Sequence, residues 1–154
     1  MRNFEFHDHL NNISGSINLN IYKNGELIDT YNDHNLVVNG GRKRLAQLAA
    51  GLSTDYITMI GVGSGETQEN EFDASLTDQQ LFEIQGFDDT PAVTLDGLDV
   101  IFAFHIKQSE ANGLMIHELG LFCSDGVMFS HRVRRGGIFK EEDIELKGTW
   151  TLHF

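Results

Sequence analysis

The sequence predicts a mainly β fold, an antiparallel β-sandwich or flattened barrel with one α-helix at about residues 41–50. Several short segments alternate apolar and polar residues with a period of two, which is typical of half-buried strands. Sixteen glycines stand against a single proline, Pro91, which favours many tight turns over a proline-rich linker. Only one substantial stretch consists of strong helix formers, so we expect one helix packed on a side or an end of the strands.

The length of 154 residues fits one domain, because a chain of this size can bury roughly 70% of its unfolded surface in a single core. We assign residues 13–154 to a single β-rich domain and residues 1–12 to an N-terminal arm. The N-terminus lacks the apolar stretch of a signal peptide, and no run approaches the length that spans a bilayer. We therefore expect a soluble protein that is made in the cytoplasm and does not insert into membranes.

Residues 16–32 predict a β-hairpin. Apolar residues alternate with polar ones over residues 17–21, and Asn24-Gly25 follows directly. This dipeptide suits a type I′ turn, in which both central residues need a positive φ, and residues 27–31 can return as the partner strand.

Residues 41–50 predict the helix, and Gly51 predicts its end. Leu45, Leu48 and Ala49 have the spacing of one helix face, which can pack on the sheet while the basic residues at the start of the helix stay in solvent.

The rest of the chain predicts strands. We expect a buried strand at residues 56–62, followed by a long polar loop to about residue 81. A strand at 100–106 is apolar on both faces. Residues 114–122 and 127–133 are expected to form a hairpin, and residues 144–154 a closing strand. The closing strand alternates to its last residue and places Trp150, Leu152 and Phe154 on its apolar side. The C-terminus is therefore expected to be part of the sheet.

The motifs of common enzyme classes are missing. Gly61-Val62-Gly63-Ser64-Gly65 lacks the third glycine of a dinucleotide-binding loop and the lysine of a phosphate loop, so we interpret its glycines as turn-forming. Ser64 lacks the spacing of a nucleophile elbow. Cys123 is the only cysteine, which excludes an intrachain disulfide, and it is expected to be a buried small hydrophobe. We predict no catalytic residues and no cofactor, and hence a protein that is not an enzyme.

Three histidines leave a metal site open as an alternative. His105, His117 and His131 lie on three successive predicted strands and would converge only if the strand register allowed it. Ordinary half-buried polar residues are the other interpretation, and our prediction is that the chain binds no metal.

The charges favour protein partners over nucleic acid. With 11 basic and 23 acidic residues the net charge is −12, which repels a phosphate backbone. Two basic clusters are candidates for contact with the acidic surface of another subunit, with solvated surface residues as the alternative; these residues are Arg42, Lys43, Arg44, Arg132, Arg134 and Arg135.

A series of sequence segments in fixed order resembles small tail, tail-fibre and other virion structural proteins of tailed bacteriophages and prophages. The most specific segment is Ser-Glu-Ala-Asn-Gly-Leu-Met-Ile-His-Glu-Leu-Gly-Leu-Phe at 109–122. The other segments are residues 39–41, 48–51, 57–65, 73–76, 128–133, 138–146 and 150–154. The resemblance covers about residues 36–154, and it does not extend to residues 1–35.

This resemblance implies a β-rich assembly module rather than an enzyme. The expected function is a tail, baseplate or tail-fibre adaptor that forms a homo-oligomer, docks other virion proteins and resides in the virion after assembly in the host cytoplasm. The alternatives are a neck or capsid decoration protein and a host-surface carbohydrate-binding module. The last would need exposed aromatic rings, for which Trp150, Tyr22, Tyr31 and Tyr56 are the candidates, although we expect Trp150 to be buried.

Overall fold

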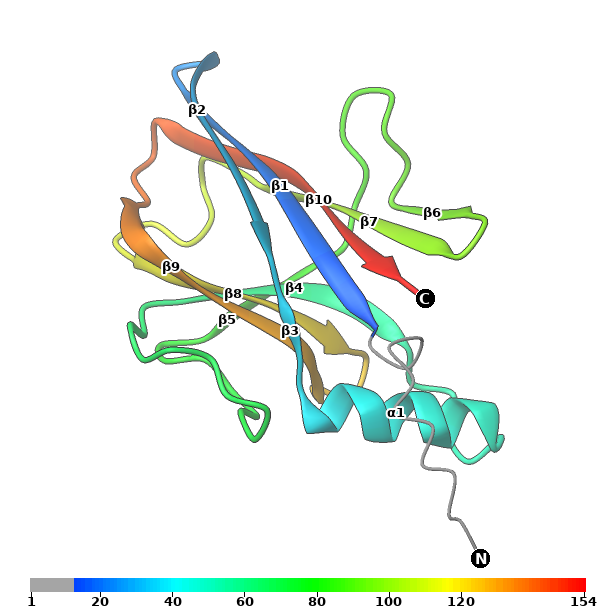
Figure 1. Ribbon diagram of the computed structural model, residues 1–154. Coiled ribbons are helices and arrows are strands. Elements are labelled where there is room, and N and C mark those ends of the chain that lie inside the picture. Colours follow the sequence, from blue (N-terminus) through cyan, green and yellow to red (C-terminus); the bar gives the residue numbers. More distant parts are fainter. Residues whose placement is uncertain (1–12) are drawn as a thin grey trace, which may run out of the picture.

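The computed structural model describes residues 13–154, in which two five-stranded antiparallel sheets pack together with one α-helix at one end (Figure 1). The predicted β-sandwich is confirmed, and the barrel alternative is wrong because each sheet keeps two edge strands. The arm predicted at residues 1–12 lies outside the described residues.

Sheet A has the strand order β2-β1-β10-β7-β6 and sheet B the order β3-β9-β8-β4-β5. The strands of sheet A are β1 (Ser14–Lys23), β2 (Glu26–His34), β6 (Val93–Asp96), β7 (Asp99–Ile106) and β10 (Ile144–His153). Those of sheet B are β3 (Leu36–Val37), β4 (Ile57–Gly63), β5 (Gln80–Glu83), β8 (Met115–Cys123) and β9 (Met128–Phe139).

The first hairpin forms as predicted. β1 and β2 pair antiparallel across Asn24 and Gly25, whose φ angles of 50° and 81° are both positive. Positive φ at both central residues is the property that makes an Asn-Gly pair suitable for this turn.

The closing strand lies inside sheet A. β10 pairs with β1 on one side and with β7 on the other, so the C-terminal residues belong to a central strand. Trp150 and Leu152 are fully buried between the sheets, as expected. The placement of Phe154 in the core is wrong, because it follows the end of β10 and is 46% exposed.

The inner faces of both sheets form the core. Its largest fully buried side chains include Trp150, Phe104, Leu19, Phe129 and Leu121, which come from both sheets. A smaller cluster on the outer face of sheet B joins Phe122 and Met128 to Leu76, a residue of the long loop between β4 and β5. That loop, predicted as polar, therefore contributes one apolar side chain that holds it against the sheet.

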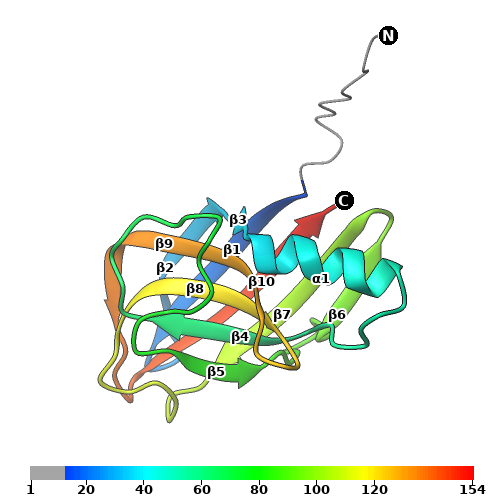
Figure 2. The ribbon, with the colours of Figure 1, turned by 90° about the horizontal axis from the view of Figure 1, so that it is seen from below.

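Helix α1 (Asn39–Ala49) begins two residues earlier than predicted. Gly40 and Gly41 lie in its first turn, where a side chain on either would collide with the backbone of β9. These glycines therefore let the helix start approach the strand. Figure 2 shows α1 beside the end of β10 and the β6–β7 hairpin. Among the described residues, no helix is long and apolar enough to cross a membrane.

β9 continues six residues beyond its predicted end at residue 133. The ladder between β8 and β9 shifts register, from Glu118 opposite Val133 to Ile116 opposite Ile138, so β9 bulges outward over residues 134–137. Gly136 and Gly137 therefore lie inside β9.

Candidate functional site

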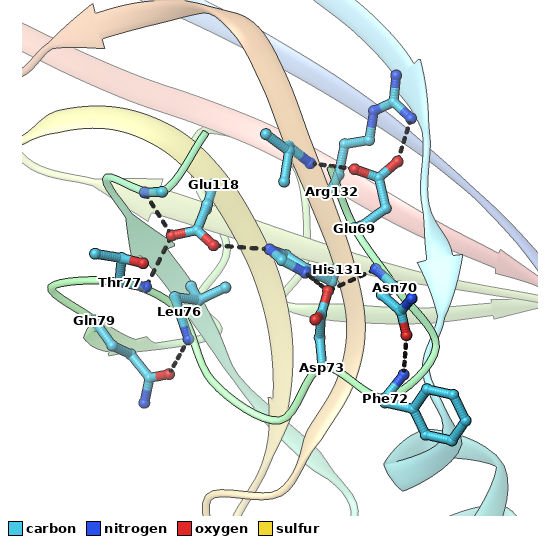
Figure 3. A network of polar contacts seen from close by, with 12 residues as sticks. Glu69, Asn70, Phe72, Asp73, Leu76, Thr77, Gln79, Glu118, His131 and Arg132 are labelled. Atoms are coloured by element: carbon cyan, nitrogen blue, oxygen red, sulfur yellow. Dashed lines mark hydrogen bonds and ion pairs between the residues drawn. The ribbon is translucent and has the colours of Figure 1, made fainter. Parts of the chain in front are cut away.

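A buried polar network lies on the outer face of sheet B (Figure 3). His131 of β9 lies between two carboxylates: its Nε2 is 3.1 Å from an oxygen of Glu118 on β8, and its Nδ1 is 2.8 Å from an oxygen of Asp73 in the β4–β5 loop. Each ring nitrogen of His131 therefore has a carboxylate oxygen as its partner.

The second carboxylate oxygen of Glu118 holds both ends of the β4–β5 loop. It accepts hydrogen bonds from the backbone N–H of Gly65 at 2.8 Å and of Thr77 at 2.9 Å. A Cβ atom on Gly65 would lie 2.7 Å from that oxygen, and one on Gly63 would lie 2.7 Å from the Cβ of Leu76. The interpretation of these glycines as turn-forming is wrong, since Gly63 is in β4 and neither residue has a positive φ. They make room for the Glu118 carboxylate.

This network is closed to a substrate. Both His131 and Glu118 are buried, and the hydrogen bonds described above occupy both ring nitrogens and both carboxylate oxygens. It can hold a loop against a sheet, and it offers no open position for a reacting group.

The three histidines do not converge. His105 lies on sheet A, where Nε2 is 2.7 Å from Glu145, whereas His117 and His131 lie on sheet B with separate partners. Within residues 13–154, no group of three or more His, Cys, Asp or Glu side chains is arranged to hold a metal ion. The division of the strands between two sheets separates His105 from the other two, and the register of β8 against β9 gives His117 and His131 different partners.

The arginines of β9 differ in exposure. Arg132 contacts Asp33 of β2 through Nε at 2.7 Å and Glu69 of the loop at 2.8 Å, so it joins the edge of sheet A to the loop. Arg134 lies over the ring of Tyr31, 4.8 Å from its centroid. Burial, together with a hydrogen bond to Asp33, raises the pKa of Tyr31 to about 12. Arg135 is exposed.

The basic residues of α1 also divide. The expectation that all three stay in solvent is wrong for Arg44, which is buried and lies 2.5 Å from Asp125 in the β8–β9 turn. It also donates to the carbonyl of Asp55 at 2.9 Å, and its hydrogen bond lowers the pKa of Asp125 below the usual carboxyl value. Arg42 and Lys43 are exposed. Of the six predicted interface residues, only Arg42, Lys43 and Arg135 have exposed side chains.

An apolar groove, which the sequence did not predict, lies between α1, the start of β4, the β6–β7 hairpin and the end of β10. Its volume is about 250 Å³. Its lining consists of Arg44, Leu45, Leu48, Tyr56, Ile57, Val93, Val100, Phe102, Cys123, Phe129, Leu152 and Phe154. Arg44 supplies the only charged side chain of this lining, and its guanidinium is paired with Asp125. The groove can therefore receive apolar side chains.

The groove exists because sheet B does not extend over β6. Val93 and Leu95 pair with Phe102 and Val100, and cross-strand partners share a face, so these side chains lie on the core side of sheet A. Val93 is nevertheless 53% exposed, and Tyr56 at the opposite rim is 65% exposed. The alternation of Val93 and Leu95 in the sequence indicates that these side chains share a face, but it does not indicate whether that face is covered.

Comparisons of the chain with protein-family models, curated proteins and solved structures gave no match.

Proposed function

We propose that this chain is a non-enzymatic structural component of a tailed-phage particle, in or attached to the tail, that forms a homo-oligomer and binds other virion proteins. The single observation that carries the binding role is the open apolar groove at the α1 end of the sandwich. The assignment to a phage particle rests on the ordered segments of residues 36–154, above all residues 109–122.

Exposed apolar surface supports an assembly role. Leu52, Leu95 and Leu98 are all more than two-thirds exposed, in the segments that follow α1 and in the β6–β7 hairpin. Soluble monomers rarely leave large contiguous apolar patches in water, and such patches mark interaction surfaces. The edge strand β6 adds backbone groups without a ladder partner among the described residues, which a neighbouring chain can use.

The use of the reactive side chains supports a non-enzymatic role. Lys140 is fully buried, and its Nζ donates to the carbonyls of Gln108 and Glu141 and to the side chain of Asn112. Burial lowers the pKa of Lys140 below its ordinary value and raises that of the Cys123 thiol to about 11. Both side chains are buried, like that of His131, and Cys123 lies in the otherwise apolar wall of the groove.

Quantitative mass spectrometry of purified particles tests this proposal. The chain is counted relative to the major capsid and tail-tube proteins of the source phage. A low count that matches tail symmetry is expected for an adaptor or fibre protein. A count on the scale of the capsid would replace the tail role by a decoration role, and absence from the particle would overturn the proposal.

A carbohydrate-binding module is the second candidate, and the outer face of sheet A favours it. Amide and hydroxyl side chains, among them Asn18, Asn32 and Thr149, line a shallow hollow of about 280 Å³ there. The aromatic contribution is weak, because Trp150 is buried and the ring of Tyr22 is covered by Lys147, 5.2 Å from its centroid. Glycan-array binding that is lost in Asn18→Ala and Asn32→Ala variants would favour this candidate.

A further inference from the structure

The groove lies beside the free edge of β6, whose residue Val93 is part of its lining. β6 is an edge strand of the five-stranded sheet A, so a sixth strand could pair with its free edge. Alternate side chains of such a strand would continue the core-facing row of Val93 and Leu95 over the groove. This is the geometry of β-strand addition, in which backbone hydrogen bonds bind the segment and pockets select alternate side chains.

The N-terminal residues have the composition that this receptor needs. Phe4 and Phe6 are separated by one residue, Glu5, so in an extended chain both rings lie on one face. Glu5 and His7 would then lie on the opposite face, which is the solvent side of an added strand. Phe4 and Phe6 are apolar, as is the lining of the groove.

The point where the arm joins the fold lies at the groove. Ser14, the first residue of β1, pairs with His153, and the neighbouring Leu152 and Phe154 line the groove. Ile13 packs against the core beside them. Phe6 precedes Ser14 by eight residues, which span roughly 26 Å when extended. That reach exceeds the roughly 19 Å, four strand spacings, between β1 and a strand added beyond β6.

We propose that residues 1–12 of one copy bind the groove of a second copy as a strand added to β6, with Phe4 and Phe6 in the groove. This inference rests on the proposed function and names the contact that joins the copies. Because the arm joins the fold at Ile13, next to the strand end that lines the groove, two copies related by a two-fold axis can exchange both arms at once.

The exposed residues around the groove favour a second copy over the chain's own arm. Leu52 and Leu98 do not line the groove and are 80% and 72% exposed, so a segment that only filled the groove would leave both in water. In a dimer, the Leu52 and Leu98 side chains of the two copies can pack together while each arm fills the groove of the other copy. The exchange therefore removes these leucines and the arm from water.

Disulfide trapping between differently labelled copies tests the exchange. A full-length Phe6→Cys chain is mixed with a full-length, size-tagged Val93→Cys chain, and both carry Cys123→Ser to remove the native thiol. We expect a covalent heterodimer after mild oxidation. The matched control is Leu27→Cys on β2, the other edge of sheet A, whose 55% exposure is close to the 53% of Val93. Equal trapping at residue 27 would overturn the proposal.

A single chain that carries both Phe6→Cys and Val93→Cys separates exchange from self-docking. Exchange gives covalent dimers, whereas a purely intramolecular disulfide would overturn the proposal. As an independent measurement, Phe4→Ser with Phe6→Ser should raise the dissociation constant of the oligomer at least tenfold in sedimentation experiments, with Asn11→Ser as the control. An unchanged constant would also overturn the exchange, while presence of the chain in purified particles would still support the proposed function.

Discussion

Glu118 lies on the outer face of sheet B, and its carboxylate makes three hydrogen bonds there. One of its oxygens faces the buried ring of His131, and the other accepts two backbone N–H groups of the β4–β5 loop. Removing one member of a buried charged network leaves the others without partners, and this is more costly than losing an exposed ion pair. The effect of a substitution at this residue should therefore be large.

We predict that Glu118→Ala lowers the free energy of unfolding by about 3 kcal/mol, because it leaves the His131 ring and the N–H groups of Gly65 and Thr77 unsatisfied. Urea unfolding followed by Trp150 fluorescence measures the change. The control is Glu66→Ala, whose carboxylate is 75% exposed and 3.4 Å from His117, and which should change stability by less than about 0.5 kcal/mol. Equal effects of the two substitutions would contradict the role of the network.

The Cys123 thiol should be unreactive in the folded protein. Burial raises its pKa to about 11, so at pH 8 the thiol is almost entirely protonated and also shielded from reagents. We expect a thiol-specific chromogenic reagent to react over hours with native protein and within seconds in denaturant. Rapid stoichiometric reaction of the native protein would show that residue 123 is accessible.

Among the elements, β10 connects most of sheet A. It pairs with β1 along ten residues and with β7 along eight, and it supplies Trp150 and Leu152 to the core. Its outer neighbours β2 and β6 reach the sheet only through β1 and β7. Loss of the second half of β10 would therefore expose inner edges on both sides.

We predict that a chain ending at residue 148 does not fold, because it lacks Trp150 and Leu152, each worth about 2 to 5 kcal/mol in a core. Circular dichroism and thermal melting provide the measurement. A chain that lacks only Phe154, which is partly exposed, should still melt cooperatively. If the shorter chain melted at the temperature of the parent, the central place of β10 in the fold would be refuted.

At the scale of the whole molecule, stability and assembly should separate. Both sheets of residues 13–154 contribute to the core described above, and we expect this part of the chain to fold on its own. Assembly, in contrast, is proposed to use residues 1–12 together with the groove.

Deletion of residues 1–12 should therefore leave cooperative unfolding intact while weakening self-association. Thermal melting at high dilution measures cooperative unfolding, and sedimentation velocity over a range of concentrations measures self-association. If self-association survived the deletion unaltered, the arm would not be the docking element.

The sequence by itself determined the alternation of strands, the Asn24-Gly25 turn, the single helix and the burial of Trp150 and Cys123. These properties follow from residues close in the chain, because a period of two or 3.6 fixes which side chains share a face. The ends of elements were less predictable, as at α1, whose two glycines start the helix because β9 lies against them.

Only the tertiary structure decided which charges meet and where the core stays open. Arg132 and Asp33 are 99 residues apart, and Arg44 and Asp125 are 81 apart, so no local spacing indicates either pair. The groove also depends on contacts between distant segments. The alternation of Val93 and Leu95 specifies that the two side chains share a face. Whether the opposite sheet covers that face depends on strand order and register between distant segments.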